Sequence, residues 1–124
     1  SASYEGSEFV PDHACDSDVE TEWLLPDGAN GWIECVLPSP SDVSVVRITN
    51  GRNRAYGDRA VKDYVVSLVV GDRVIAEAEG SFSAIEARPE PVSVSIRGEG
   101  VTKIRLEVRS FHRLGAALSG LDWQ

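Results

Sequence analysis

The sequence contains few cysteines and no long hydrophobic run. Its 124 residues include only Cys15 and Cys35, which are too few for a disulfide scaffold. Both lie in apolar settings, so we interpret them as buried thiols, with a disulfide as the alternative. No stretch approaches the roughly 20 apolar residues of a membrane helix, and no basic and apolar leader precedes the domain. We therefore expect one soluble domain, cut from a longer protein and large enough to bury a core.

Basic residues are scarce, above all in the first third of the chain. The net charge is -8, from 12 Lys and Arg against 20 Asp and Glu. Nucleic-acid affinity comes mainly from basic side chains that replace counterions, so this balance argues against a nucleic-acid partner. Residues 1–46 hold ten acidic residues and no Lys or Arg, and the first basic residue is Arg47. We expect the Arg-rich loop at residues 51–60 to pack near the acidic turns of the same fold.

Residues suited to catalysis are also few. The sequence has no nucleophile elbow and no pair of histidines at metal-binding spacing. His13 and His112 are the only near-neutral bases, and we expect both to be surface loop residues. Ser119 precedes Gly120 inside an expected strand, not at a sharp strand-to-helix turn. We therefore predict no enzymatic activity.

What the sequence does contain is alternating hydrophobicity. Residues 103–110 alternate with the period of two that is typical of a strand covered on one face. Residues 61–70 are β-branched on both faces, as expected of a strand covered on both sides. Further strands are expected at 32–37, ended by Pro38 and Pro40, and at 43–50, 73–79, 92–96 and 117–123, with an edge strand within 1–13 and a hairpin turn at Gly71 and Asp72. No helical period is present. The pattern predicts a single all-β domain over residues 1–124, a jelly-roll β-sandwich of about eight antiparallel strands.

One acidic turn carries a resemblance to a known family. Residues 14–23, ACDSDVETEW, place acidic residues between residue types that prefer burial. Ala14, Asp16, Asp18, Thr21 and Trp23 match the signature Ala-x-Asp-Gly-Asp-x-x-Thr-x-Trp of galactose-binding-like domains. This superfamily includes discoidin, or coagulation factor 5/8 type C, modules and family 32 carbohydrate-binding modules. Gly31 to Leu37, Arg47 to Gly51, Arg59 to Tyr64 and Ala117 to Trp123 resemble further segments of the family in the same order. The Asn50 and Gly51 ending, with its Arg-rich loop, is similar to a subgroup of bacterial glycan-binding modules.

The resemblance implies a non-catalytic glycan-recognition module, monomeric and part of a larger bacterial protein. The sequence leaves the compartment open, and an extracellular or cell-surface location is slightly favoured. The alternative is a protein-protein interaction module, because relatives of this fold also bind protein surfaces. Many galactose-binding relatives carry a His after the Trp of the signature, whereas this chain has Leu24, which argues against galactose itself.

Sugar recognition needs an apolar face for the ring and planar groups that hydrogen-bond its hydroxyls. The candidates lie in the loop after residue 50 and in the last loop, residues 111–115, which follows the strand expected at 103–110. The predicted ligand-binding residues are Arg52, Asn53, Arg54, Tyr56, His112 and Arg113, with Trp32 and Phe111 as further aromatic platforms. By family analogy Arg52 or Arg54 would contact the sugar. The alternative is that Trp32 packs against a neighbouring strand and that the arginines pair with acids.

The resemblance also implies a structural calcium site and no other cofactor. In many relatives the acidic turn binds calcium through positions matched here by Asp16, Asp18 and Thr21, and a Glu of the closing strand completes the shell. Calcium takes six to eight oxygen ligands. In this chain Gly120 stands where that Glu would be, with Asp122 two residues further on. We therefore predict a weak or absent calcium site, and a turn held by its own hydrogen bonds and by Trp23.

Overall fold

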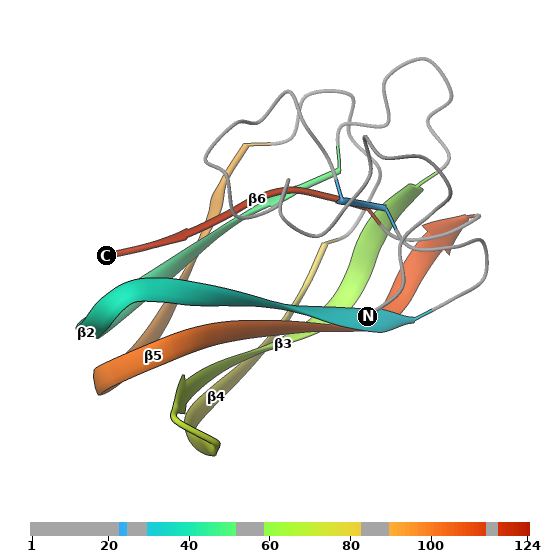
Figure 1. The fold of residues 1–124 in the computed structure, drawn as a ribbon. Helices are drawn as coiled ribbons and strands as arrows, with labels where there is room; N and C mark the ends of the chain where they lie inside the picture. Colours follow the sequence, from blue (N-terminus) through green and yellow to red (C-terminus); the bar gives the residue numbers. More distant parts are fainter. Residues whose placement is uncertain (1–22, 25–29, 52–58, 83–89, 114–116) are drawn as a thin grey trace.

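The computed structural model describes residues 23–24, 30–51, 59–82, 90–113 and 117–124, which form six strands and no helix. The strands are β1 (Trp23–Leu24), β2 (Gly31–Asn50), β3 (Arg59–Val70), β4 (Arg73–Ser81), β5 (Val92–Arg113) and β6 (Ala117–Trp123). All neighbours pair antiparallel, in the order β1-β6-β2-β5-β3-β4 (Figure 1). The predicted all-β class is confirmed. Within these residues no helix is long and apolar enough to cross a membrane.

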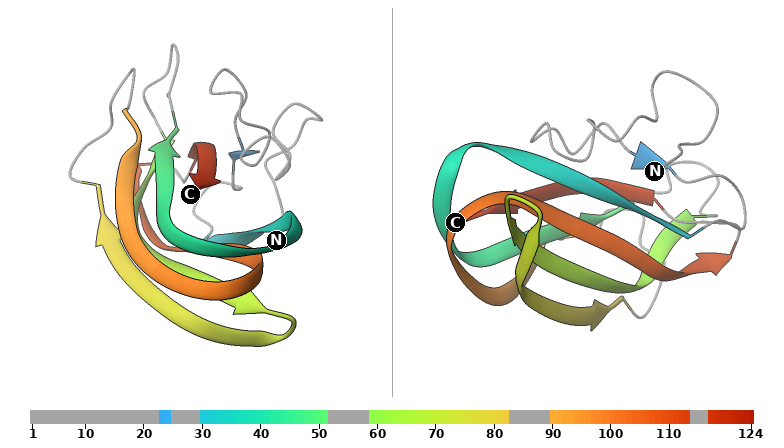
Figure 2. Two further views of the ribbon diagram at one scale, coloured as in Figure 1. Left: turned by 90° about the vertical axis from the view of Figure 1, so that its left-hand side faces the viewer. Right: turned by 60° about the horizontal axis from the view of Figure 1, so that its bottom comes forward.

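The two longest strands, β2 and β5, fold the sheet into a sandwich. Residues 31–36 of β2 pair with residues 103–108 of β5, whereas residues 43–48 pair with residues 92–98. Both strands therefore cross from one layer to the other, and Figure 2 shows the curl that results. One layer holds the first part of β2, the second part of β5, β3 and β4; the other holds the remaining parts of β2 and β5 with β6 and β1. Each layer has four strand segments, and seven of the eight match strands expected from the sequence. The eighth, β1, was not expected, and the edge strand expected within residues 1–13 lies outside the described residues.

The prolines of β2 mark this crossing and do not end the strand, so that predicted boundary is wrong. Pro38 and Pro40 are exposed and lie between Val36 and Ser41, where the pairing with β5 skips in register. Proline has no N–H to donate, and it is tolerated where a strand bulges. On β5 the matching bend lies beside Gly100, whose φ of 63° suits glycine.

The hydrophobic core fills the space between the two layers. Alternate residues of β2, β3, β5 and β6 point into it, as the period of two predicts: Ile33, Cys35, Leu37, Val46, Ile48, Val66, Leu68, Ile96, Ile104, Leu106, Val108, Leu118 and Leu121. The outer face of β3 is covered as well, since Val65 and Val69 are 4% and 5% exposed. Val65 lies between Glu107 on β5 and Glu79 on β4, whose longer side chains flank it. The predicted burial of both faces of this strand is confirmed.

Cys35 is buried as expected, but it is not a free thiol. Its side chain is 2% exposed and disulfide-bonded, and the chain's other cysteine is Cys15. The interpretation as a buried thiol is therefore wrong for Cys35. Sequence spacing alone does not show which cysteines approach each other in space.

The sandwich has two different ends. At the turn end, defined by Asp42, Val69, Gly71, Gly100 and Thr102, β3 reverses into β4 through Gly71 and Asp72, the predicted hairpin turn. Thr102 Oγ1 accepts from the N–H of Gly71 (2.9 Å) and donates to the carbonyl of Val69 (3.2 Å). Asp42 Oδ1 accepts from the N–H of Gly100 (3.1 Å). At the opposite end, the loop end, strand ends meet around Asn50, Gly51, Ala60, Val61, Phe82, His112 and Leu118.

Candidate functional site

The candidate site is the loop end, and Asn50 lies at its centre. Asn50 is the last residue of β2 and is 3% exposed. Its Nδ2 donates to the carbonyl of Val61 (3.0 Å), while its Oδ1 accepts from the N–H groups of Val61 (2.9 Å) and Gly51 (2.9 Å). These bonds join the residues on either side of segment 52–58. The sequence marked Asn50 only as part of a resemblance, and the available signal was an Asn-Gly pair directly after a buried strand.

The start of β3 is paired in turn with the end of β5. Ala60 lies opposite His112, and Arg59 lies opposite Arg113. The structure therefore brings the flank of segment 52–58 next to residues 112–113. The sequence predicted these two regions as parts of one ligand-binding site. Ala60 and Val61 are fully buried, so this part of the end rests on the core. The ends of β2 and β5 and the start of β3 therefore form the floor of the site.

His112 is the penultimate residue of β5 and not the surface loop residue that the sequence suggested. It is half-buried, and its Nε2 lies 2.8 Å from the carbonyl oxygen of Phe82. A carbonyl only accepts, so Nε2 of the imidazole carries a proton and donates in this contact. His112 thus ties the end of β5 to the residue that follows β4.

The remaining predicted ligand-binding residues are only partly described. Arg52, Asn53, Arg54 and Tyr56 lie outside the described residues. Arg113 ends β5 and pairs with Arg59 along the backbone. Their roles stay predictions. Phe111 is half-buried and packs against the core, so at least part of its ring serves the fold.

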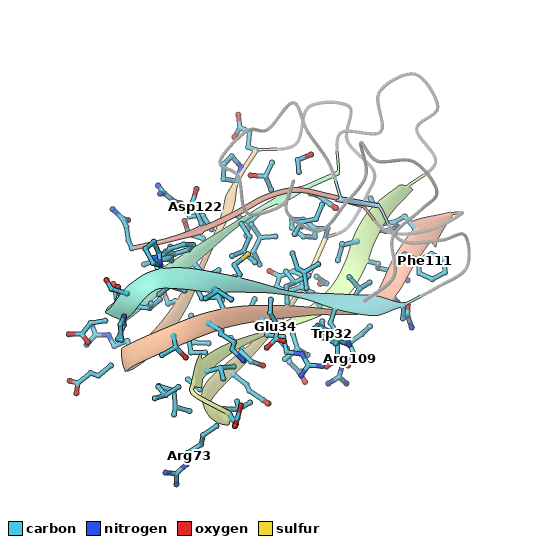
Figure 3. All side chains as sticks on the ribbon, viewed as in Figure 1. Trp32, Glu34, Arg73, Arg109, Phe111 and Asp122 are labelled. Carbon is cyan, nitrogen blue, oxygen red and sulfur yellow. The ribbon has the colours of Figure 1, made fainter. Side chains whose placement is uncertain are left out.

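Trp32 lies on a different surface from His112. It pairs with Glu107 on the outer face of β2 and β5, roughly 16 Å along β5 from His112 at about 3.3 Å per residue. Its ring is 37% exposed and lies 4.6 Å from the guanidinium carbon of Arg105. In Figure 3 the side chains of Trp32, Glu34 and Arg109 lie together, well away from Phe111. This packing matches the alternative interpretation, in which Trp32 contacts a neighbouring strand.

An open hollow of about 440 Å³ lies between β3 and β4, lined by Asp63, Tyr64, Val65, Glu79, Gly80, Ser81 and Arg109. Its charged groups are partly engaged already. Asp63 Oδ2 accepts from Ser110 Oγ (2.6 Å), and Arg109 Nε pairs with Glu107 (3.0 Å). Burial raises the pKa of the Tyr64 hydroxyl, which keeps it protonated at neutral pH. The hollow is therefore a weaker candidate than the loop end.

The predicted metal residues Asp16, Asp18 and Thr21 lie outside the described residues. Gly120, the position where relatives carry a Glu, is opposite Thr49 in the sheet and supplies no side-chain oxygen. Among the described residues no group of three or more His, Cys, Asp or Glu is placed to hold a metal ion. That the calcium site is weak or absent therefore stays a prediction.

Comparison with known proteins identifies the fold. The F5/8 type C domain of a Bacteroides fragilis protein superposes with a TM-score of 0.73 at 12% identity, over 96% of this chain and 82% of that chain. The family 32 carbohydrate-binding module of Clostridium perfringens NanJ, solved with galactose, gives 0.73 at 17% identity over 99% and 90%. Chitosan-binding module 2 of a Paenibacillus chitosanase/glucanase, solved with chitotriose, gives 0.69 at 16% over 98% and 91%.

Sequence comparison adds nothing to this likeness. No family model matches the chain, and no curated protein is similar to it in sequence. At these identities the structural likeness establishes the fold, over nearly the whole chain, and leaves the ligand open. The chain therefore has the galactose-binding-like β-sandwich fold of F5/8 type C and family 32 carbohydrate-binding modules, as its sequence motifs indicated.

Proposed function

We propose that this protein is a non-catalytic glycan-recognition module that binds its ligand at the loop end of the sandwich. The observation that carries the proposal is that the residues flanking segment 52–58 meet the end of β5, held by Asn50 and by the pairing of Ala60 with His112. In sequence, this segment and the end of β5 together include Arg52, Asn53, Arg54, Tyr56, His112 and Arg113. Guanidinium, amide and imidazole groups can hydrogen-bond sugar hydroxyls, and the tyrosine ring offers a flat apolar face.

Two further findings support the proposal. Structural relatives of similar length were solved with galactose and with chitotriose, so the fold accommodates sugars in those proteins. Ser119, a nucleophile type, is fully buried within β6 and unsuited to attack a substrate. A disulfide at Cys35 fits an oxidising compartment, and therefore an extracellular or cell-surface location, because disulfides persist there.

The direct test is a broad glycan array followed by titration calorimetry. We expect at least one glycan to bind with a Kd tighter than ~1 mM, or about 4 kcal/mol. The double variant Arg52→Ala with Arg54→Ala should lose that binding. A matched control is Arg73→Ala with Arg97→Ala, which removes the same charge from exposed positions away from the loop end and should bind as the wild type does.

The alternative function, a protein-interaction module, is separated by the same variants. If no glycan binds more tightly than ~1 mM, and Arg52→Ala with Arg54→Ala abolishes capture of one defined protein while the control does not, the loop end recognises protein. If the wild type and the double variant Arg52→Ala with Arg54→Ala bind the glycan or the protein equally well, the binding site does not depend on these arginines and the proposed site is wrong.

A further inference from the structure

Asn50 links two strands that are not neighbours in the sheet. The end of β2 belongs to one layer and pairs with β6, whereas the start of β3 belongs to the other layer and pairs with β5. The amide of Asn50 spans this gap and binds both the N–H and the carbonyl of Val61. At the loop end, this buried side chain therefore joins the two layers by hydrogen bonds.

The geometry leaves little freedom to this side chain. Both acceptor positions of its Oδ1 and one of its two N–H donors are used, all at 2.9 to 3.0 Å. At 3% exposure, water cannot readily replace a lost partner. Val61, which pairs with Phe111 on its other side, would keep a buried N–H and carbonyl without partners if Asn50 changed.

The same side chain fixes where segment 52–58 leaves and rejoins the fold. It binds Gly51 on one side of the segment and Val61 beyond the other. Ala60, next to Val61, lies opposite His112. A change at Asn50 would therefore shift the flanks of the segment relative to the end of β5 without touching any group that faces a ligand.

We propose that Asn50 is a positioning residue for ligand binding, which holds Gly51 and Val61, on either side of segment 52–58, in place relative to His112 and Arg113. The proposal rests on the proposed glycan function of the loop end. A site whose residues are already held in the binding arrangement binds its ligand more tightly, because fewer groups lose conformational freedom when the ligand binds. Asn50 supplies that order from inside the core, and it makes no contact with the sugar.

The test compares Asn50→Asp with Thr102→Ala. Asn50→Asp keeps the size and both acceptor bonds but removes the donor to the carbonyl of Val61, and Asn50→Ala removes all three bonds. Thr102→Ala is the matched control, because it removes two side-chain bonds to the backbone at the turn end. Chitotriose and galactose serve as probes in calorimetry, well below the melting temperature of every variant.

A second readout needs no ligand. Trypsin cleaves after Arg, and Arg52, Arg54 and Arg59 lie in or beside the segment that Asn50 closes. We expect Asn50→Asp to be cut there several-fold faster than the wild type, with Thr102→Ala cut at the wild-type rate.

In calorimetry we expect Asn50→Asp to bind whichever probe the wild type binds roughly tenfold more weakly, and Thr102→Ala to bind it as the wild type does.

The outcomes separate the two proposals. If the wild type binds a probe and Asn50→Asp binds it equally well, the positioning role is wrong while the glycan function stands. If trypsin cuts Asn50→Asp and Thr102→Ala alike, the positioning role is also wrong. If trypsin distinguishes the variants but the wild type binds no sugar on the array, the order imposed by Asn50 is supported and the glycan function fails.

Discussion

The two ends of the sandwich are held by different means. At the turn end the backbone carries most of the geometry, through two glycines with φ of 62° and 63°. Their N–H groups donate exposed hydrogen bonds to Thr102 and Asp42. At the loop end the buried amide of Asn50 binds Val61 on β3, a strand that does not pair with β2. The half-buried imidazole of His112 binds the carbonyl of Phe82, the residue after β4. A buried polar group costs more to leave unpaired than an exposed one, so the loop end should tolerate change less well.

This difference matches what each end does. A two-residue turn needs only the correct dihedral angles, which glycine adopts at little cost. An end that presents a binding surface must hold separate segments in one arrangement, and buried side chains can fix that arrangement from below. Recognition residues commonly lie on connections that a rigid scaffold positions.

The largest expected effect is common to both ends. Cys35 lies on the inner face of β2, in the core between them. Reducing its disulfide should lower the free energy of unfolding by about 2–5 kcal/mol. Urea unfolding with and without reductant measures this effect. Reductant should not change the stability of Cys35→Ala, and a wild type that is equally stable when reduced would contradict the assignment.

The next effect separates the ends directly. Asn50→Ala removes the partners of two buried backbone groups of Val61 and should cost about 3 kcal/mol, against about 1 kcal/mol for Thr102→Ala at the exposed turn end. Chemical denaturation of both variants provides the numbers. Equal losses would show that burial at Asn50 carries no special weight.

Two glycines extend the comparison to the backbone. A Cβ at Gly80 would overlap the hydroxyl of Tyr64, which is 3% exposed and packs 5.4 Å from the ring of Phe82. Gly80→Ala should therefore cost about 2 kcal/mol through overpacking. Gly71→Ala has open space around it and should cost about 1 kcal/mol, from its positive φ alone. Thermal unfolding distinguishes them, and a Gly80→Ala variant as stable as the wild type would mean that Tyr64 moves freely.

The smallest effect tests whether burial or location matters. Asn30 Nδ2 donates to the carbonyl of Arg109 (3.0 Å) at an exposed position. Asn30→Ala should cost only about 0.5 kcal/mol, since water can replace the lost partner. If Asn30→Ala lowers the free energy of unfolding as much as Asn50→Ala does, burial does not explain why the loop end is sensitive to substitution.

Much of the fold could be predicted from the sequence, because local patterns encode it. The alternation in residues 103–110, the double-sided burial of β3 and the hairpin at Gly71 all follow from side-chain periodicity and turn chemistry. The acidic signature and the strand motifs pointed to the fold that the structural relatives share. The strand boundaries near Pro38 and Gly100 were misjudged, because residues that commonly end strands can also bend a long strand between layers. The sequence also placed residues 111–113 in a loop, whereas β5 continues to Arg113.

The site could be predicted only in part. The sequence named His112 and Arg113 as partners of the loop after Asn50, and the pairing of Ala60 with His112 brings these regions together. It could not show that Asn50 binds Val61 or that His112 binds Phe82, since both contacts depend on the path of the chain between layers. The disulfide at Cys35 also depends on which segments the fold brings together, so the sequence could not show it.

The measurement that tests the central claim most directly is chemical-shift mapping of the backbone amides during titration with a bound glycan. Recognition at the loop end predicts that the amides of Gly51, Phe82 and His112 shift in proportion to binding. The amides of Gly71, Gly100 and Thr102 should stay in place. A glycan that binds and shifts the amides of the turn end, while those of Gly51 and His112 do not move, would contradict the proposed site.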